Sequence, residues 1–192
     1  MEWLGLILAA YIVGSIPVGL ILGKAIWKKD LRKFGSRNIG ATNAWRVLGR
    51  KAGILVFILD FLKGQLGVML GAWIIGTPTA LVVGGLFAVI GHVTSIFAGF
   101  RGGKGVATGV GVLSLLMPKV MAIVVVMWIV LFLLTRYVSI ASIVAAALTP
   151  LLAAIFEMPP IYFAFALAAA AVIVWRHREN LQRLREGREN KF

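Results

Sequence analysis

Long apolar segments, separated by short polar connections, are the feature that most restricts what this chain can form. The segments at residues 3–26, 54–75 and 79–100 are each long enough to cross a hydrocarbon core of about 30 Å. Of the 192 residues, 60% are hydrophobic, and the mean hydropathy is +0.96, far above that of an ordinary soluble domain. The sequence therefore predicts an all-α integral membrane protein that consists of a single transmembrane domain, residues 1–192.

Proline and small residues mark special points within these segments. Pro17 is expected to kink the first span, because proline lacks an amide hydrogen and clashes with the preceding turn. Gly19 and Gly23 lie four residues apart, as do Gly67 and Gly71, and this spacing is typical of helix faces that pack closely.

The stretch at residues 106–135 admits two interpretations, one long tilted helix or two short helices broken near Pro118. Charge favours two, because the basic loop at residues 27–51 and the arginine-rich tail then both lie inside the cell, as the positive-inside rule requires. We expect about seven transmembrane helices, an external N-terminus and a cytoplasmic C-terminus. The later spans are placed at residues 106–117, 119–135, 138–156 and 161–175.

A glycine-rich segment with fixed positive charge follows the third span. Three glycines allow backbone turns that other residues resist, and successive amides in such a loop can form a nest for an anion. The sequence therefore favours a phosphate site at the start of the next helix, over the alternative of a plain charged turn. Its residues are Arg101, Gly102, Gly103, Lys104, Gly105 and Thr108.

The first basic loop contains a dense set of short hydrogen-bonding side chains. Such a set can satisfy a polar ligand from several directions. The alternative is a loop-to-helix junction with Thr42 or Asn43 as the N-cap, but a cap needs only one such residue. The candidate binding residues are Ser36, Arg37, Asn38, Gly40, Thr42, Asn43 and Arg46.

Charged residues also occur at membrane depth. Asp60 and Lys63 are three apart in the second span, so they can pair on one helical face. We interpret this pair, together with His92 in the third span, mainly as structural support beneath the polar loops. A catalytic role for His92 is the less favoured alternative.

The polar residues of the C-terminal third form the last cluster. His177 and Asn180 share a face if the last span continues as a helix, and a basic stop-transfer tail would explain the arginines but not these two residues. Ser142 is expected to reach the site or else to make an ordinary interhelical hydrogen bond. Arg183 is a further candidate for phosphate binding. Glu179 is the one acidic residue expected among the polar clusters, and it should point away from His177 and Asn180.

Several function classes are excluded or disfavoured by the residues themselves. The chain has no cysteine, which excludes disulfides and a thiolate nucleophile. No acidic cluster accompanies the polar motifs, so we expect no metal and no other cofactor. Lys104 is followed by Gly105 rather than by Ser or Thr, which disfavours a nucleotide-binding P-loop. The formal net charge of +13 suits anionic lipids or phosphorylated substrates better than nucleic acid, because no soluble domain gathers the basic residues.

Taken together, the motifs resemble those of the bacterial acyl-phosphate:glycerol-3-phosphate acyltransferase family, PlsY. The similar stretches are residues 35–43, 60–64, 91–108 and 176–183, so the resemblance runs nearly from end to end. It implies a small enzyme of the bacterial inner membrane, with its active site at the cytoplasmic face and membrane lipids around it. Such an enzyme moves a fatty acyl group from acyl phosphate to the 1-hydroxyl of glycerol 3-phosphate, giving lysophosphatidic acid and phosphate.

The residues fit that reaction. Both substrates carry phosphate and the clusters are cationic, while an acyl phosphate is already activated, so positioning and electrostatic stabilisation are what the protein must supply. For the proton of the attacking hydroxyl we favour a phosphate oxygen of the donor as the base, with His177 as the alternative base. The expected catalytic residues are Ser36, Arg46, Lys104, His177 and Asn180.

The main rival from another class is a transporter or binding protein for an organic phosphate. Transporters usually place their site near the midplane between repeated halves, whereas here the polar clusters lie on one side and no repeat is evident. A structural subunit that packs against an enzyme is disfavoured, because it would not need three polar clusters.

Overall fold

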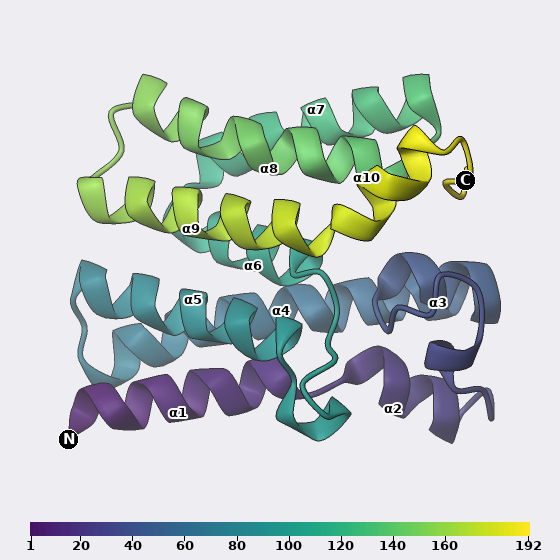
Figure 1. Cartoon of the computed structure of the whole chain (residues 1–192). Helices are drawn as coiled ribbons and strands as arrows, with labels where there is room; N and C mark the ends of the chain where they lie inside the picture. Colours follow the sequence, from purple (N-terminus) through teal and green to yellow (C-terminus); the bar gives the residue numbers. More distant parts are fainter. The chain divides into compact units, whose positions relative to one another are not determined.

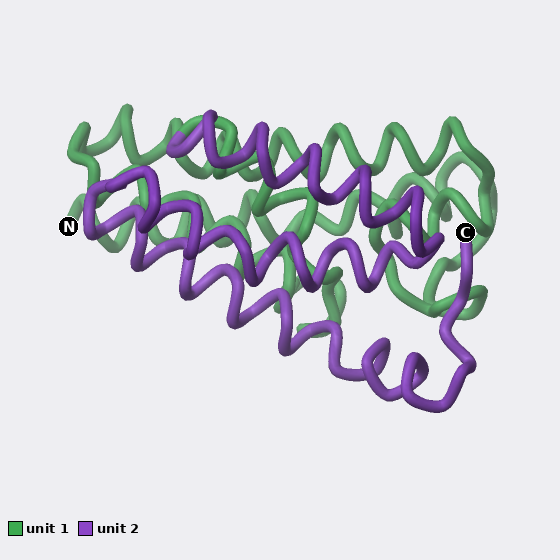
Figure 2. The backbone as a smooth tube through the Cα atoms, turned by 90° about the horizontal axis from the view of Figure 1, so that it is seen from above, with its two compact units in different colours: residues 1–115 green, residues 116–192 purple.

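The computed structural model describes all residues, Met1–Phe192, and every regular element in it is a helix. This confirms the predicted all-α class. The chain divides into two compact units, residues Met1–Leu115 and Leu116–Phe192, which are coloured separately in Figure 2 and are described here one at a time.

The first predicted span is broken as Pro17 requires. Helix α1 covers Glu2–Ser15 and helix α2 covers Val18–Ala25, with Ile16 and Pro17 between them (Figure 1). Ile16 leaves the helical region, with φ −57° and ψ 112°, because a residue before proline is driven out of the α conformation. The break exposes the last carbonyl groups of α1 at a point that lies within the span.

The rest of the first unit packs around α1. Helix α4 and helix α5 both lie against α1 and against each other, and Gly67 and Gly71 allow the α4 backbone to approach α5 closely. Short helices flank this core at the polar loops. The bounds are η1 Leu31–Lys33, α3 Ala41–Leu48, α4 Arg50–Ile74, α5 Pro78–Val93 and η2 Ile96–Ala98.

The ambiguous stretch forms two helices, as the charge argument predicted. Helix α6 covers Val106–Leu116 and helix α7 covers Pro118–Thr135, separated by Met117. Pro118 stands at the first position of α7, where its missing amide hydrogen costs no helical bond. A single tilted helix over residues 106–135 is therefore wrong.

In the second unit, α8 packs against both α7 and α9. Helix α8 covers Val138–Ile155, α9 covers Pro160–Arg176, and α10 covers Arg178–Arg185. The α9 and α10 axes are bent by 50° at His177, so the last span does not continue straight into the polar tail.

Five helical segments are long and apolar enough to cross a membrane, and a sixth results if the bent pair α9 and α10 counts as one span. Helix α6 has 11 residues, about 16 Å at 1.5 Å per residue, which is too short to cross a hydrocarbon core of about 30 Å alone. Seven full crossings and the orientation of the termini remain predictions.

Candidate active site

The glycine-rich loop begins by folding back onto the end of α5. The Gly102 amide donates to Val93 O at 3.0 Å, and the Gly103 amide donates to His92 O at 3.1 Å. These bonds satisfy carbonyl groups that the end of α5 leaves unpaired. The expectation that the Gly102 and Gly103 amides belong to an anion nest is therefore wrong, because both amides already cap a helix.

Gly103 allows the backbone of the loop to lie close to a side chain. A Cβ atom on Gly103 would lie 2.2 Å from His92 Nε2, so only glycine leaves room for the ring beneath the loop. Gly105 then takes φ +84°, a conformation that glycine adopts at little cost, and α6 begins at the next residue.

The start of α6 carries the features of an anion site. Its first intrahelical bond runs from Gly109 N to Gly105 O at 2.7 Å, so the amides of residues 106–108 lack an acceptor within the helix. The Thr108 side chain is 0% exposed, and its hydroxyl has no hydrogen-bond partner. Half-buried Lys104 immediately precedes this turn, while Arg101 is exposed. The phosphate hypothesis therefore keeps the first turn of α6, where the sequence already placed the site, and loses the Gly102 and Gly103 amides.

The first basic loop is organised by Asn43. Its Oδ1 accepts from the Ser36 amide at 2.9 Å, and its Nδ2 donates to Leu31 O, Phe34 O and Asn38 O at 3.2, 3.1 and 2.7 Å. The side chain is 1% exposed, so its hydrogen-bonding capacity is used within the loop. Asn43 builds the loop and does not supply the substrate-binding group that we expected.

The remaining candidates of this loop surround that framework. The N-cap of α3 is Gly40, whose amide donates to Asn38 Oδ1 at 2.9 Å, so neither Thr42 nor Asn43 is the cap. Thr42 and Arg46 are four residues apart on α3 and therefore share a face, and both are half-buried. Ser36 is half-buried as well, whereas Arg37 is exposed.

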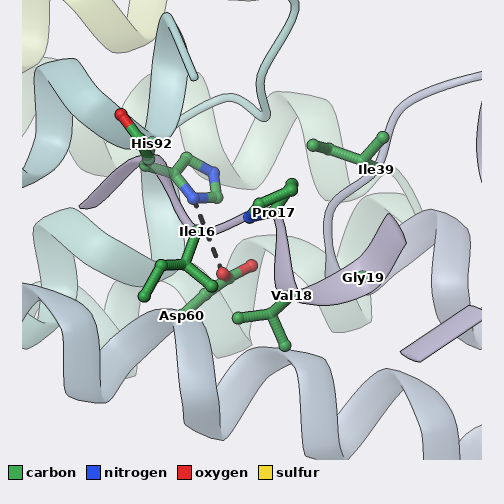
Figure 3. Close-up of a pocket in the computed structure, with 8 residues that line it drawn as sticks. Ile16, Pro17, Val18, Gly19, Ile39, Asp60 and His92 are labelled. Carbon is green, nitrogen blue, oxygen red and sulfur yellow. Dashed lines mark ion pairs between the residues drawn. The ribbon is translucent and has the colours of Figure 1, made fainter. Parts of the chain in front are cut away.

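The charged residues at membrane depth form one connected cluster, as the spacing predicted for two of them. Lys63 Nζ lies 2.8 Å from Asp60 Oδ1 and 3.2 Å from His92 Nδ1, and all three side chains are buried. His92 Nδ1 also lies 3.6 Å from Asp60 Oδ1, and a dashed line in Figure 3 marks this pair. The cluster supports the glycine loop from below, because the His92 ring lies against Gly103.

In the second unit, His177 lies at the bend between α9 and α10 and is 2% exposed. Its Nδ1 lies 2.7 Å from Ile173 O. A carbonyl group can only accept, so Nδ1 carries a hydrogen, and Nε2 is the nitrogen that can accept when the imidazole is neutral. This tautomer suits either a base or an acceptor of a substrate hydroxyl.

Glu189 is a member of this cluster that the sequence did not reveal. Its Oε1 accepts from Asn180 Nδ2 at 2.6 Å and from Ser139 Oγ at 3.0 Å, and its Oε2 accepts from Arg183 Nε at 2.7 Å. Burial raises the pKa of the Glu189 carboxyl, but these hydrogen bonds outweigh burial and hold the pKa below its ordinary value. An ionised Glu189 therefore orients Asn180 and Arg183 at neutral pH.

These contacts correct one expectation and match one of two alternatives given for another residue. Glu179 is not the only acidic residue of the polar clusters, since Glu189 lies at the centre of one. Ser142 accepts from Trp128 Nε1 at 3.0 Å, which is the interhelical hydrogen bond that we gave as the alternative to a place in the site.

A narrow recess with no room for a water molecule lies at the break between α1 and α2 (Figure 3). Its polar residues are Ser15, Asp60 and His92, while the chain around Pro17 and the side chain of Ile39 supply the rest of its wall. The recess therefore belongs to the supporting cluster and lacks the cationic groups that a phosphorylated substrate requires.

Comparison with known proteins identifies the family to which the chain belongs. Residues 4–187 match the family model described as glycerol-3-phosphate acyltransferase. The chain is 43% identical to a glycerol-3-phosphate acyltransferase of Geotalea daltonii, over 97% of this chain and 96% of the relative. It is 45% identical to the same enzyme of Geobacter sulfurreducens, over 95% of this chain and 94% of the relative.

Solved structures agree with this match. A crystal structure of PlsY, an integral membrane glycerol 3-phosphate acyltransferase, in its glycerol 3-phosphate form has a TM-score of 0.94 and 42% identity, covering 100% of this chain and 96% of that one. The lysophosphatidic acid form of PlsY has a TM-score of 0.91 and 41% identity, with the same coverage.

Proposed function

Because the chain belongs to the glycerol-3-phosphate acyltransferase family, we propose that it moves a fatty acyl group from acyl phosphate to the 1-hydroxyl of glycerol 3-phosphate. The products are lysophosphatidic acid and inorganic phosphate, and no cofactor takes part. The proposal for the acceptor and the product draws on the two relatives whose structures were solved in glycerol 3-phosphate and lysophosphatidic acid forms.

The observation that carries the donor assignment is the start of α6. A fully buried Thr108 hydroxyl without a partner, amides that lack an intrahelical acceptor and the adjacent Lys104 together suit one phosphoryl group. A helix N-terminus and a lysine stabilise negative charge, and a hydroxyl adds a hydrogen bond. A thioester donor carries no phosphoryl group at its reacting carbon and would bring no anion to this site.

The protein then need not form a covalent bond with the substrate. The 1-hydroxyl oxygen attacks the acyl carbon, the bond from that carbon to the phosphate oxygen breaks, and phosphate leaves with the electron pair. Lys104 neutralises the charge that collects on the leaving phosphate. The proton of the hydroxyl passes to a phosphate oxygen of the donor. Because the acyl group passes directly to the acceptor, no covalent acyl-enzyme forms.

The remaining candidates bind and orient the acceptor. Arg46 suits bidentate contact with the phosphate of glycerol 3-phosphate, and Ser36 and Thr42 supply hydroxyl groups beside it. The same loop takes its shape from the bond between Gly40 and Asn38 and carries the positive charge of Arg37. In the second unit, His177 Nε2 accepts from a substrate hydroxyl, and Asn180 is held by Glu189 to donate beside it.

The test of the function is product formation by the purified protein. Detergent-solubilised protein given acyl phosphate and labelled glycerol 3-phosphate should make lysophosphatidic acid, and the thioester donors acyl-CoA and acyl carrier protein should give none. A transporter would instead give uptake into proteoliposomes without product. Inside-out membrane vesicles should form product from added glycerol 3-phosphate and right-side-out vesicles should not, because we place the active site at the cytoplasmic face of the inner membrane.

The role of His177 has a separate test. His177→Asn and His177→Gln keep a hydrogen-bonding group but cannot act as a base. If the donor phosphate takes the proton, at least one of the two should lose less than the roughly 10²-fold that removal of a general base costs. Full inactivity of both, equal to that of His177→Ala and with normal binding of both substrates, would make His177 the base.

A further inference from the structure

At the break between α1 and α2, three successive carbonyl groups accept hydrogen bonds from side chains of other segments, and Ile16 O also accepts from Val18 N at 3.0 Å. Two of them accept from one side chain on another helix, since Lys63 Nζ lies 3.2 Å from Gly14 O and 2.8 Å from Ile16 O. The third, Ser15 O, accepts from Ser95 Oγ. A cation is also favourable here because a helix C-terminus is the negative end of its dipole.

The same ammonium reaches the glycine loop through His92. Lys63 Nζ lies 3.2 Å from His92 Nδ1 and 2.8 Å from Asp60 Oδ1, so one buried cation is shared among groups of α1, α4 and α5. On the side away from Lys63, the His92 ring fills the space beside Gly103. A displacement of Lys63 is therefore transmitted to both the helix break and the glycine loop.

The helix break in turn holds the first basic loop. The Ile39 carbonyl sits so close to Gly19, at the start of α2, that a Cβ there would lie 2.0 Å from the carbonyl oxygen. Leu20, Ile39 and Ala98 form a buried apolar cluster that joins α2, the first basic loop and η2. The orientation of α2 thus fixes where this loop stands.

From these contacts we infer that Lys63 is a positioning residue that sets the first basic loop and the glycine loop relative to one another. The inference rests on the proposed function, in which the two loops bind different phosphorylated substrates. Neutralising Asp60 is then only part of what Lys63 does. A small error in the relative placement of two bound substrates lowers turnover more than it weakens the binding of either.

The first test separates positioning from charge balance. Lys63→Met alone would leave Asp60 as an unpaired buried charge, so Asp60→Asn/Lys63→Met is the informative variant. We expect its kcat to fall by about 10- to 100-fold while KM for each substrate changes by less than about threefold. Lys119→Met, which changes an exposed lysine outside both loops, is the control and should match the wild type.

Recovery of wild-type kcat in the double variant would show that Lys63 only neutralises Asp60, and the inference would fail. A raised KM with unchanged kcat would also overturn it. Lys63→Arg serves if the double variant does not fold, because it keeps the positive charge beside Asp60 while a planar guanidinium cannot reproduce the contacts of the compact ammonium with Gly14 O and Ile16 O. Wild-type kcat in Lys63→Arg would count against positioning in the same way.

A distance measurement without substrates isolates this inference from the acyltransferase proposal. The chain has no cysteine, so spin labels can be attached through Lys33→Cys on η1 and Phe97→Cys on η2, both exposed positions. Pulsed electron resonance should give a narrow distance distribution in the otherwise wild-type protein and in Lys119→Met. It should be shifted or broadened in the Lys63 variants, and an unchanged distribution in a folded Lys63 variant would overturn the inference.

Discussion

Lys104→Ala should lower kcat by about 10²- to 10³-fold, because it removes the cation that precedes the first turn of α6. The neutral donors that remain there, amides and the Thr108 hydroxyl, cannot balance the charge that the leaving phosphate acquires in the transition state. Steady-state kinetics with acyl phosphate and glycerol 3-phosphate measures the effect.

Two comparisons make the Lys104 result specific. Lys119→Ala removes another lysine, exposed in the first turn of α7, and should leave kcat unchanged. Lys104→Arg keeps the charge and should recover part of the loss. If Lys104→Ala keeps more than about half of the wild-type kcat, no phosphoryl group is stabilised by this lysine.

Gly103→Ala should lower kcat by about 10²-fold or more through geometry alone. The added methyl would lie 2.2 Å from His92 Nε2, and the ring cannot retreat freely because Lys63 holds its other nitrogen at 3.2 Å. The loop must move instead, which breaks its bonds to the end of α5 and displaces the start of α6. Kinetics together with thermal unfolding of the purified protein distinguishes a displaced loop from a lost fold.

Gly5→Ala is the matched control for Gly103→Ala, because a Cβ at Gly5 meets no atom within 4 Å. It should retain wild-type activity and unfolding temperature. Full activity in Gly103→Ala would show that the contact between the loop and the His92 ring does not position the site.

The parts of the fold that could be predicted from the sequence follow from local rules. An apolar segment of sufficient length predicts a span, and a proline predicts where a helix ends, as at Pro17 and Pro118. The Asp60–Lys63 pair could be predicted because residues three apart share a helical face. None of these inferences needs knowledge of where distant segments meet.

The parts of the site that could not be predicted depend on such meetings. The Gly102 and Gly103 amides were expected to face an anion, but the chain returns to the end of α5 and uses them there. Glu189 accepts a hydrogen bond from Ser139, which is 50 residues away in the sequence. It lies in a tail where no periodicity of the sequence distinguishes it from its neighbours. Asn43 was correctly chosen as polar and unusual, yet its partners lie within its own loop.

The measurement that tests the account most directly is phosphate release by the purified protein with acyl phosphate, first without and then with glycerol 3-phosphate. Direct transfer to a positioned acceptor predicts that phosphate above the uncatalysed rate appears only when the acceptor is present, in equal amount to lysophosphatidic acid. A burst of one phosphate per protein molecule without the acceptor would reveal a covalent acyl-enzyme and contradict the account.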